Sequence, residues 1–112
     1  MEGFHISGNT LRVSVDLDLD SDEAFKAACD QLLTIAADTL YMDLTRVGFI
    51  GSSFFGQMFV VNYKAKKAGR KLVIRTPQRL MAIMELLGLP QLVEVQVVNE
   101  GAGEAPKEKA GA

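Results

Sequence analysis

The chain has 112 residues, of which 48% are hydrophobic and 23% charged, and its formal net charge is −2 with a pI near 5.3. That length supports one domain core and is too short for two. The mildly acidic balance argues against nucleic acid or an anionic membrane as the main partner. No stretch reaches the ~18 apolar residues of a membrane span, and the N-terminus lacks the basic start and apolar run of a secretory signal. We therefore expect a cytoplasmic protein.

The chain carries one cysteine, Cys29, and one histidine, His5. A disulfide within the chain is excluded, which is typical of a protein in a reducing compartment. Cys29 lies in a helical stretch among small and apolar residues, which favours a buried core thiol over a nucleophile. A catalytic triad or a histidine-based metal site would depend on His5 alone. The sequence predicts no enzyme active site, no metal site and no cofactor.

Residues 11–19 alternate apolar and polar side chains, which is the period of a half-buried strand. The predicted inner face consists of Leu11, Val13, Val15, Leu17 and Leu19. The pattern leaves room for a further short strand before residue 8. The acids of the other face and of the following turn lack the central glycine and the final glutamate of a calcium-binding loop. We interpret them as a solvated strand face followed by a helix cap, with a helix from about 21 to 37.

The second half of the chain continues the alternation of strands and helices. The pattern predicts a strand over 40–44, a loop over 45–48 and a helix over 53–68 that ends at Gly69. A strand over 71–75 follows, and Thr76-Pro77 predicts the start of a helix that ends at Gly88. The last strand is expected over 92–98. The cluster of basic side chains at the end of the long helix fits a solvated helix end better than a binding patch: Lys64, Lys66, Lys67, Arg70 and Lys71.

Alternation of this kind predicts an α/β fold, in which parallel strands are joined by helices packed on the sheet. Residues 1–98 form the expected domain. Residues 99–112 have no apolar period and contain mainly Gly, Ala, Glu and Lys, so we expect a disordered C-terminal tail.

Four segments carry a resemblance to a known family. They are residues 41–47 (YMDLTRV), 49–56 (FIGSSFFG), 66–74 (KKAGRKLVI) and 84–89 (MELLGL). In this order and spacing they resemble the STAS domain, the sulfate transporter and anti-sigma factor antagonist domain. The resemblance covers about residues 11–98. It implies a mixed four- to five-stranded sheet with helices packed on it.

The resemblance also implies a function. Anti-sigma factor antagonists of this family bind an anti-sigma factor, often a serine kinase, which switches them off by phosphorylating the second residue of a serine pair. A phosphatase then restores binding. Carried over by position, the phosphate acceptor is Ser53. The expected partner-binding residues are Gly51, Ser52, Ser53, Phe54, Phe55, Gly56 and Met58. The resemblance does not involve direct contact with nucleic acid or a membrane, and we expect a monomer or weak dimer.

Physical chemistry is consistent with this carry-over. A serine where a strand turns into a helix lies beside unpaired helical N–H groups, which tolerate a phosphate. The added charge of about −2 would disfavour docking of an apolar or acidic partner. The alternative for Ser52 and Ser53 is plain helix capping. For Phe54 and Phe55, exposure as a partner anchor and burial in the core both stay open.

The departures from the family pattern support a second reading. The family's aspartate before the serine pair is Gly51 here, and the glycine after it is Phe54. These changes favour a STAS scaffold subunit without a phosphorylation switch, for example in a lipid-transport or stress-signalling complex.

Overall fold

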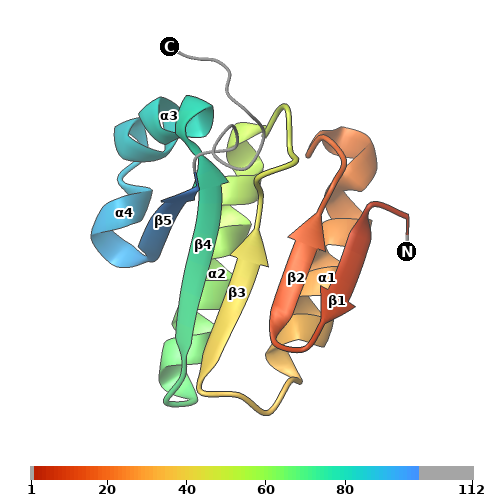
Figure 1. Ribbon diagram of the computed structural model, residues 1–112, viewed down its shortest axis with the longest axis vertical. Helices are drawn as coiled ribbons and strands as arrows, with labels where there is room; N and C mark the ends of the chain where they lie inside the picture. Colours follow the sequence, from red (N-terminus) through yellow and green to blue (C-terminus); the bar gives the residue numbers. More distant parts are fainter. Residues whose placement is uncertain (1, 99–112) are drawn as a thin grey trace.

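The computed structural model describes residues 2–98, which form one five-stranded sheet with helices (Figure 1). The strands stand in chain order: β1 (Phe4–Ser7), β2 (Thr10–Val13), β3 (Thr39–Asp43), β4 (Lys71–Pro77) and β5 (Glu94–Val98). β1 and β2 form an antiparallel hairpin, and the remaining neighbours are parallel. The predicted mixed α/β sheet is confirmed, as is a short strand before residue 8. The predicted tail at 99–112 lies outside the described residues.

The helices join the parallel strands. They are the 3-10 helix η1 (Leu19–Ser21), α1 (Asp22–Leu33), α2 (Ser52–Lys67), the 3-10 helix η2 (Gln78–Leu80), α3 (Met81–Leu86) and α4 (Leu89–Leu92). Figure 1 shows α1 and α2 behind the sheet, with α3 and α4 beside β4 and β5. Because α1 and α2 run back along parallel strands, both begin at the end of the sheet where those strands finish. None of the helices within 2–98 is long and apolar enough to cross a membrane.

The core lies between the sheet and the pair α1 and α2. Its central side chains have no exposed surface: Leu11, Val13, Leu17, Phe25, Leu32, Leu40, Met42, Met58 and Ile74. The other face of the sheet is polar. There Arg12 pairs with Asp43 at 3.5 Å, and the Arg75 guanidinium lies 4.2 Å from the centre of the Tyr41 ring. Within β2 and β3, successive side chains therefore alternate between the buried face and the polar face.

The predicted strand over 11–19 is shorter in the structure. β2 ends at Val13, and only Leu17 returns to the sheet, in an isolated parallel bridge with Ile50. Leu19, expected on the buried face, is 91% exposed. Two aspartates turn the chain: Asp16 Oδ1 accepts hydrogen bonds from the backbone of the 48–49 segment, and Asp18 caps η1. These local side-chain bonds compete with the strand and override its alternation.

Helix α1 ends at Leu33, four residues before the predicted end at 37. The Arg70 guanidinium, which comes from the turn before β4, donates to the carbonyls of Leu33 and Ile35. Thr34 adds a hydroxyl bond of 2.6 Å to the Gln31 carbonyl. Arg70 thus supplies donors to carbonyls at the last residue of α1 and just beyond it, which fixes the end of the helix.

The prediction of a helix start at Thr76-Pro77 is wrong. β4 continues through Pro77, and η2 and α3 begin only after it. Thr76 is fully buried and pairs in register with Val97 of β5. Parallel pairing with β5 therefore decides the conformation at this point, and the proline is accommodated as the last residue of the strand. Gly88, with φ 77°, ends α3 as predicted, but the short helix α4 before β5 was not expected.

Candidate functional site

The serine pair lies in the first turn of α2. Ser52 is the first helical residue, and Gly51 is the N-cap with an extended backbone (φ −68°, ψ 148°). Both serines are exposed, and neither hydroxyl has a hydrogen bond to another residue within 2–98. The capping alternative for the serines is therefore wrong, because the cap position is taken by a glycine and no side chain caps the helix. Both hydroxyls remain available to solvent.

The predicted partner-binding aromatics point inward instead. Phe54 and Phe55 are each 1% exposed and Met58 is fully buried. Phe54 packs edge-on against Phe25 of α1, with ring centres 5.4 Å apart. The expectation of an exposed aromatic anchor in this pair is wrong, because the first turn of α2 lies against α1 and the sheet and buries the side that carries these three residues. Gly56 is exposed, and nothing lies within 4 Å of a Cβ built there.

Two exposed apolar side chains lie on the paired segments that lead into η1 and α2. Leu19 is 91% exposed and Phe49 is 55% exposed. Hydrogen bonds join their two segments: the N–H of Leu17 donates to the Phe49 carbonyl at 2.8 Å, and the N–H of Gly51 donates to the Leu17 carbonyl at 2.8 Å. Leu19 thus follows the bridge by two residues on one segment, as Ser52 does on the other. We call the surface formed by Leu19, Phe49, Ser52 and Ser53 the docking end.

Asp16 fixes the position of Phe49. Its Oδ1 accepts the backbone N–H groups of Gly48 and Phe49, both at 3.1 Å. Sequence reasoning missed the exposure of Leu19, because the alternation of 11–19 assigned it to the core. The signal that could have found it is the pair of aspartates on either side, Asp18 and Asp20, which is typical of a helix cap rather than a strand. No comparable signal marks Phe49.

The charge at the docking end is negative on one side. Asp18 and Asp20 lie in and before η1, and Asp22 and Glu23 lie in the first turn of α1, whereas the first turn of α2 contains no acid. Asp22 accepts a hydrogen bond of 2.6 Å from Gln57 of α2 and pairs with Lys26 at 3.3 Å. Gln57 lies one turn beyond Ser53, so Asp22 of α1 contacts α2 one turn after the serine. The positive end of the α2 dipole faces outward without a neutralising side chain of its own.

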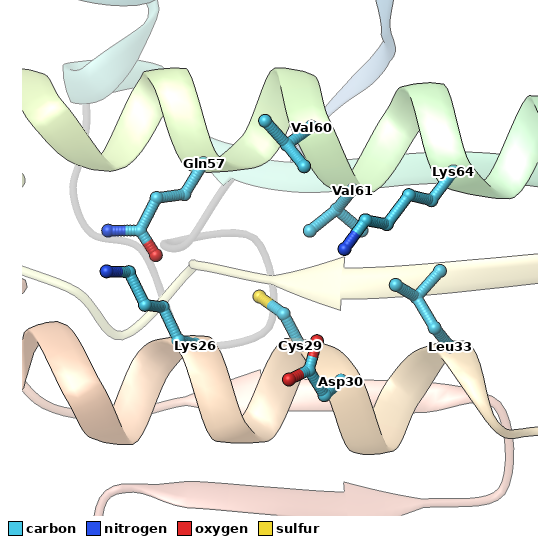
Figure 2. Close-up of a pocket in the computed structure, with 8 residues that line it drawn as sticks. All are labelled: Lys26, Cys29, Asp30, Leu33, Gln57, Val60, Val61 and Lys64. Atoms are coloured by element: carbon cyan, nitrogen blue, oxygen red, sulfur yellow. The ribbon is translucent and has the colours of Figure 1, made fainter.

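A groove of about 300 Å³ runs between α1 and α2 (Figure 2). Its apolar lining consists of Cys29, Leu33, Val60 and Val61, and polar side chains flank it: Lys26, Asp30, Gln57 and Lys64. The Cys29 thiol is buried, as predicted. Burial, with a smaller contribution from Asp30, raises the pKa of Cys29 to about 12. A thiol with so high a pKa is a poor nucleophile at neutral pH.

The basic cluster of 64–71 does not form one patch. Arg70 binds the end of α1, Lys71 pairs with Glu94 at 2.9 Å, and the Lys67 ammonium lies 5.9 Å from the centre of the Tyr63 ring. These three side chains are thus engaged at different parts of the fold. In the described part of the chain, no group of three or more His, Cys, Asp or Glu is placed to hold a metal ion.

Comparisons with known proteins are consistent with this fold. A crystal structure of a proposed anti-sigma factor antagonist from Thermotoga maritima superimposes with a TM-score of 0.70, at 16% identity and 90% coverage of each chain. An NMR structure of the same protein gives a TM-score of 0.68 at 18% identity, covering 97% of this chain and 90% of the other. At this identity the likeness establishes the fold. No curated protein sequence matches the chain. The family model described as "Mlab, STAS domain" matches residues 3–94, so the chain belongs to the STAS domain family.

Proposed function

We propose that the protein is a non-enzymatic binding module, an anti-sigma factor antagonist that docks on an anti-sigma factor through the docking end. One observation carries the proposal: two exposed serines, without hydrogen-bond partners within residues 2–98, lie on the same two paired segments as two exposed large apolar side chains, Leu19 and Phe49. Large apolar side chains that a fold leaves outside are typical anchors for a partner. The solved structure with a related fold, itself a proposed anti-sigma factor antagonist, is consistent with this role.

The proposed switch is phosphorylation of Ser53 by a serine kinase, reversed by a cognate phosphatase. A phosphate on the second residue of α2 adds about −2 of charge beside unpaired helical N–H groups, which accommodate an anion without refolding. The same charge lies on the surface that a partner must cover. Desolvating it against an apolar partner is costly unless the partner supplies a cation.

The charges around the docking end indicate which kind of partner surface would fit it. Acids at the start of α1 border the docking end, and the centre is apolar. The complementary surface is an apolar pocket with basic residues on one side. Because the basic residues of such a partner face the acids near α1 and its apolar part faces Ser53, a phosphate on Ser53 meets no cation and binding weakens. An anti-sigma factor as partner is consistent with the predicted cytoplasmic location of this protein. That location stays a prediction.

A second function is favoured by one observation, the residue at the N-cap. Gly51 stands where the family pattern has an aspartate before the serines. A side chain would fit there, because a Cβ built on Gly51 meets nothing closer than 3.4 Å. Space therefore does not explain the glycine. A fixed STAS subunit of a lipid-transport or stress-signalling complex needs no such acid, and it would use the same Leu19 and Phe49 surface permanently.

The experiment compares partner capture from the native cytoplasm by wild type, Ser53→Ala and Ser53→Asp, followed by titration of the captured protein. Ser52→Asp is the matched control, because it adds the same charge one residue earlier. An antagonist that switches retains the partner with Ser53→Ala and binds it at least tenfold more weakly with Ser53→Asp than with Ser52→Asp. Equal binding by all four proteins supports the fixed subunit instead. Phe49→Ser weakens binding in both cases, and unchanged binding by that variant would reject the docking end itself.

A further inference from the structure

Strand β5 is an edge of the sheet. It pairs with β4 on one side, and four of its five residues are exposed. Val97 is 45% exposed and Val98 is 36% exposed. An exposed edge strand with apolar side chains is a template for pairing with another strand. The opposite edge, β1, has only four residues and a buried first side chain, so it offers less.

The direction of the β5 backbone groups follows from the neighbouring strands. The N–H of Lys71 donates to Asp38 and the carbonyl of Arg75 accepts from Leu44, so the odd residues of β4 bond toward β3. The even residues of β4 then bond toward β5, because successive residues of a strand point their backbone groups to opposite sides. In a parallel pair, the backbone groups of a residue bond to the two residues that flank its register partner. Ile74 is in register with Val95 and bonds to 94 and 96, and Thr76 is in register with Val97 and bonds to 96 and 98. The N–H and C=O groups of Val95 and Val97 therefore point outward.

The sequence of β5, Glu-Val-Gln-Val-Val, suits pairing with a second copy of itself. In an antiparallel pair centred on Gln96, Val95 stands opposite Val97 of the other copy, and the outward backbone groups of both valines exchange hydrogen bonds. Glu94 stands opposite Val98 of the other copy. No like charges meet, and the pair has the twofold symmetry of an isologous dimer. We propose that β5 is a self-association edge, through which two copies join their sheets into one ten-stranded sheet.

The geometry makes Gln96 the one side chain that meets its own copy. Residue 96 occupies a pair without mutual hydrogen bonds, in which the Cα atoms of antiparallel strands approach to about 4.5 Å and the side chains lie closest. Gln96 is exposed in the monomer. An amide on the axis can donate to its symmetry mate and accept from it. A charge at this position would face an identical charge.

The test uses that symmetry. Sedimentation equilibrium of the full chain from about 10 µM to about 1 mM covers the affinities expected for an interface this small. Wild type dimerises reversibly in this range. Gln96→Lys and Gln96→Glu each weaken the dimer at least tenfold, because like charges oppose each other on the axis. An equimolar mixture of the two variants restores association to the wild-type level or above, as a heterodimer.

The matched controls are Gln31→Lys and Gln31→Glu, on the exposed side of α1 and away from β5. They carry the same charges and leave dimerisation unchanged, alone or mixed. Thermal unfolding establishes that all four variants remain folded. A wild type that stays monomeric up to about 1 mM overturns the proposal, since even a weak interface is populated there. A mixture of the Gln96 variants that associates no better than either alone also overturns it, because only a contact across the axis produces that recovery.

Discussion

Replacing Arg70 with methionine tests the explanation for the end of α1. The guanidinium donates to the carbonyls of Ile35 and Leu33, the second at 2.9 Å, across 35 and 37 positions of sequence. Methionine retains most of the aliphatic stem and its packing but removes both bonds. The change in stability of this variant therefore reports the loss of the two hydrogen bonds and not a loss of side-chain packing.

Hydrogen bonds from a charged donor contribute about 1.5–3 kcal/mol each. Arg70 is half-buried, so water replaces part of the lost bonding when the guanidinium is removed. We therefore expect a net loss of about 2 kcal/mol in the free energy of unfolding. For a domain of this size, that loss lowers Tm by about 8–16 °C. Arg70→Lys should fall between wild type and Arg70→Met, since one ammonium replaces the two nitrogens of the guanidinium fork.

The assay is urea unfolding followed by circular dichroism, with the slope m compared between variants. Arg46→Met is the matched control, an exposed arginine in the loop after β3, and its effect should stay within about 0.5 kcal/mol. A loss below about 0.5 kcal/mol for Arg70→Met at unchanged m would refute the reasoning. In that case the end of α1 would be set by its own sequence rather than by the arginine.

Three further outcomes follow from the structure. Asp16→Ala should lower the free energy of unfolding by about 1 kcal/mol and weaken partner binding, because the 48–49 backbone loses its acceptor; Asp16→Asn retains an acceptor oxygen and should lie between Asp16→Ala and wild type in a binding titration. Cys29 should react with a disulfide reagent at pH 8 about a thousandfold more slowly in the folded chain than in denaturant. Equal reaction rates of the thiol in the folded and the denatured chain would contradict its burial. Because the unfolded thiol ionises near pH 9.0 and the folded thiol only at about 12, the free energy of unfolding should also fall as pH rises between these values. Gly51→Asp should raise the free energy of unfolding by a few tenths of a kcal/mol, and with it Tm, because it supplies a missing cap. A lower Tm would reject that interpretation.

The order of elements was predictable because its signals are local. Strand β3 and helix α2 agree with the predicted ranges within one residue at each end. The bounds of both elements follow from periodic runs of apolar residues, and the flanking residues do not continue those runs. The left-handed Gly69 and Gly88 ended their helices as expected, because a positive φ is cheap only for glycine.

The errors arose where residues distant in sequence decide the conformation. Asp16 turns the chain by binding a segment 32 positions away, so a window over 11–19 could not detect the break. Thr76 stays in a strand because β5 pairs with it, a partner that begins 18 residues later. A capping pattern such as Thr-Pro reports only the local preference of a segment to start a helix. Pairing with a neighbouring strand in the sheet outweighs that preference.

The candidate site was predictable in part. Ser53 was placed at the start of a helix and is exposed there. Its apolar surroundings were assigned to the wrong residues, since the orientation of Phe54 and Phe55 depends on how α2 lies on the sheet. Periodicity alone gives a nearly apolar first half of that helix and cannot say which side faces inward. Leu19 and Phe49 come from loops, whose course depends on contacts elsewhere in the fold.

The first turn of α2 separates two roles within four consecutive residues. Phe54 and Phe55 are held in the core, while Ser52 and Ser53 point to solvent. Substitutions at the outer pair therefore change what a partner meets and leave the interior unchanged, and substitutions at the inner pair do the reverse. Single outward-facing changes can therefore alter the surface at the start of α2 without passing through an unstable intermediate.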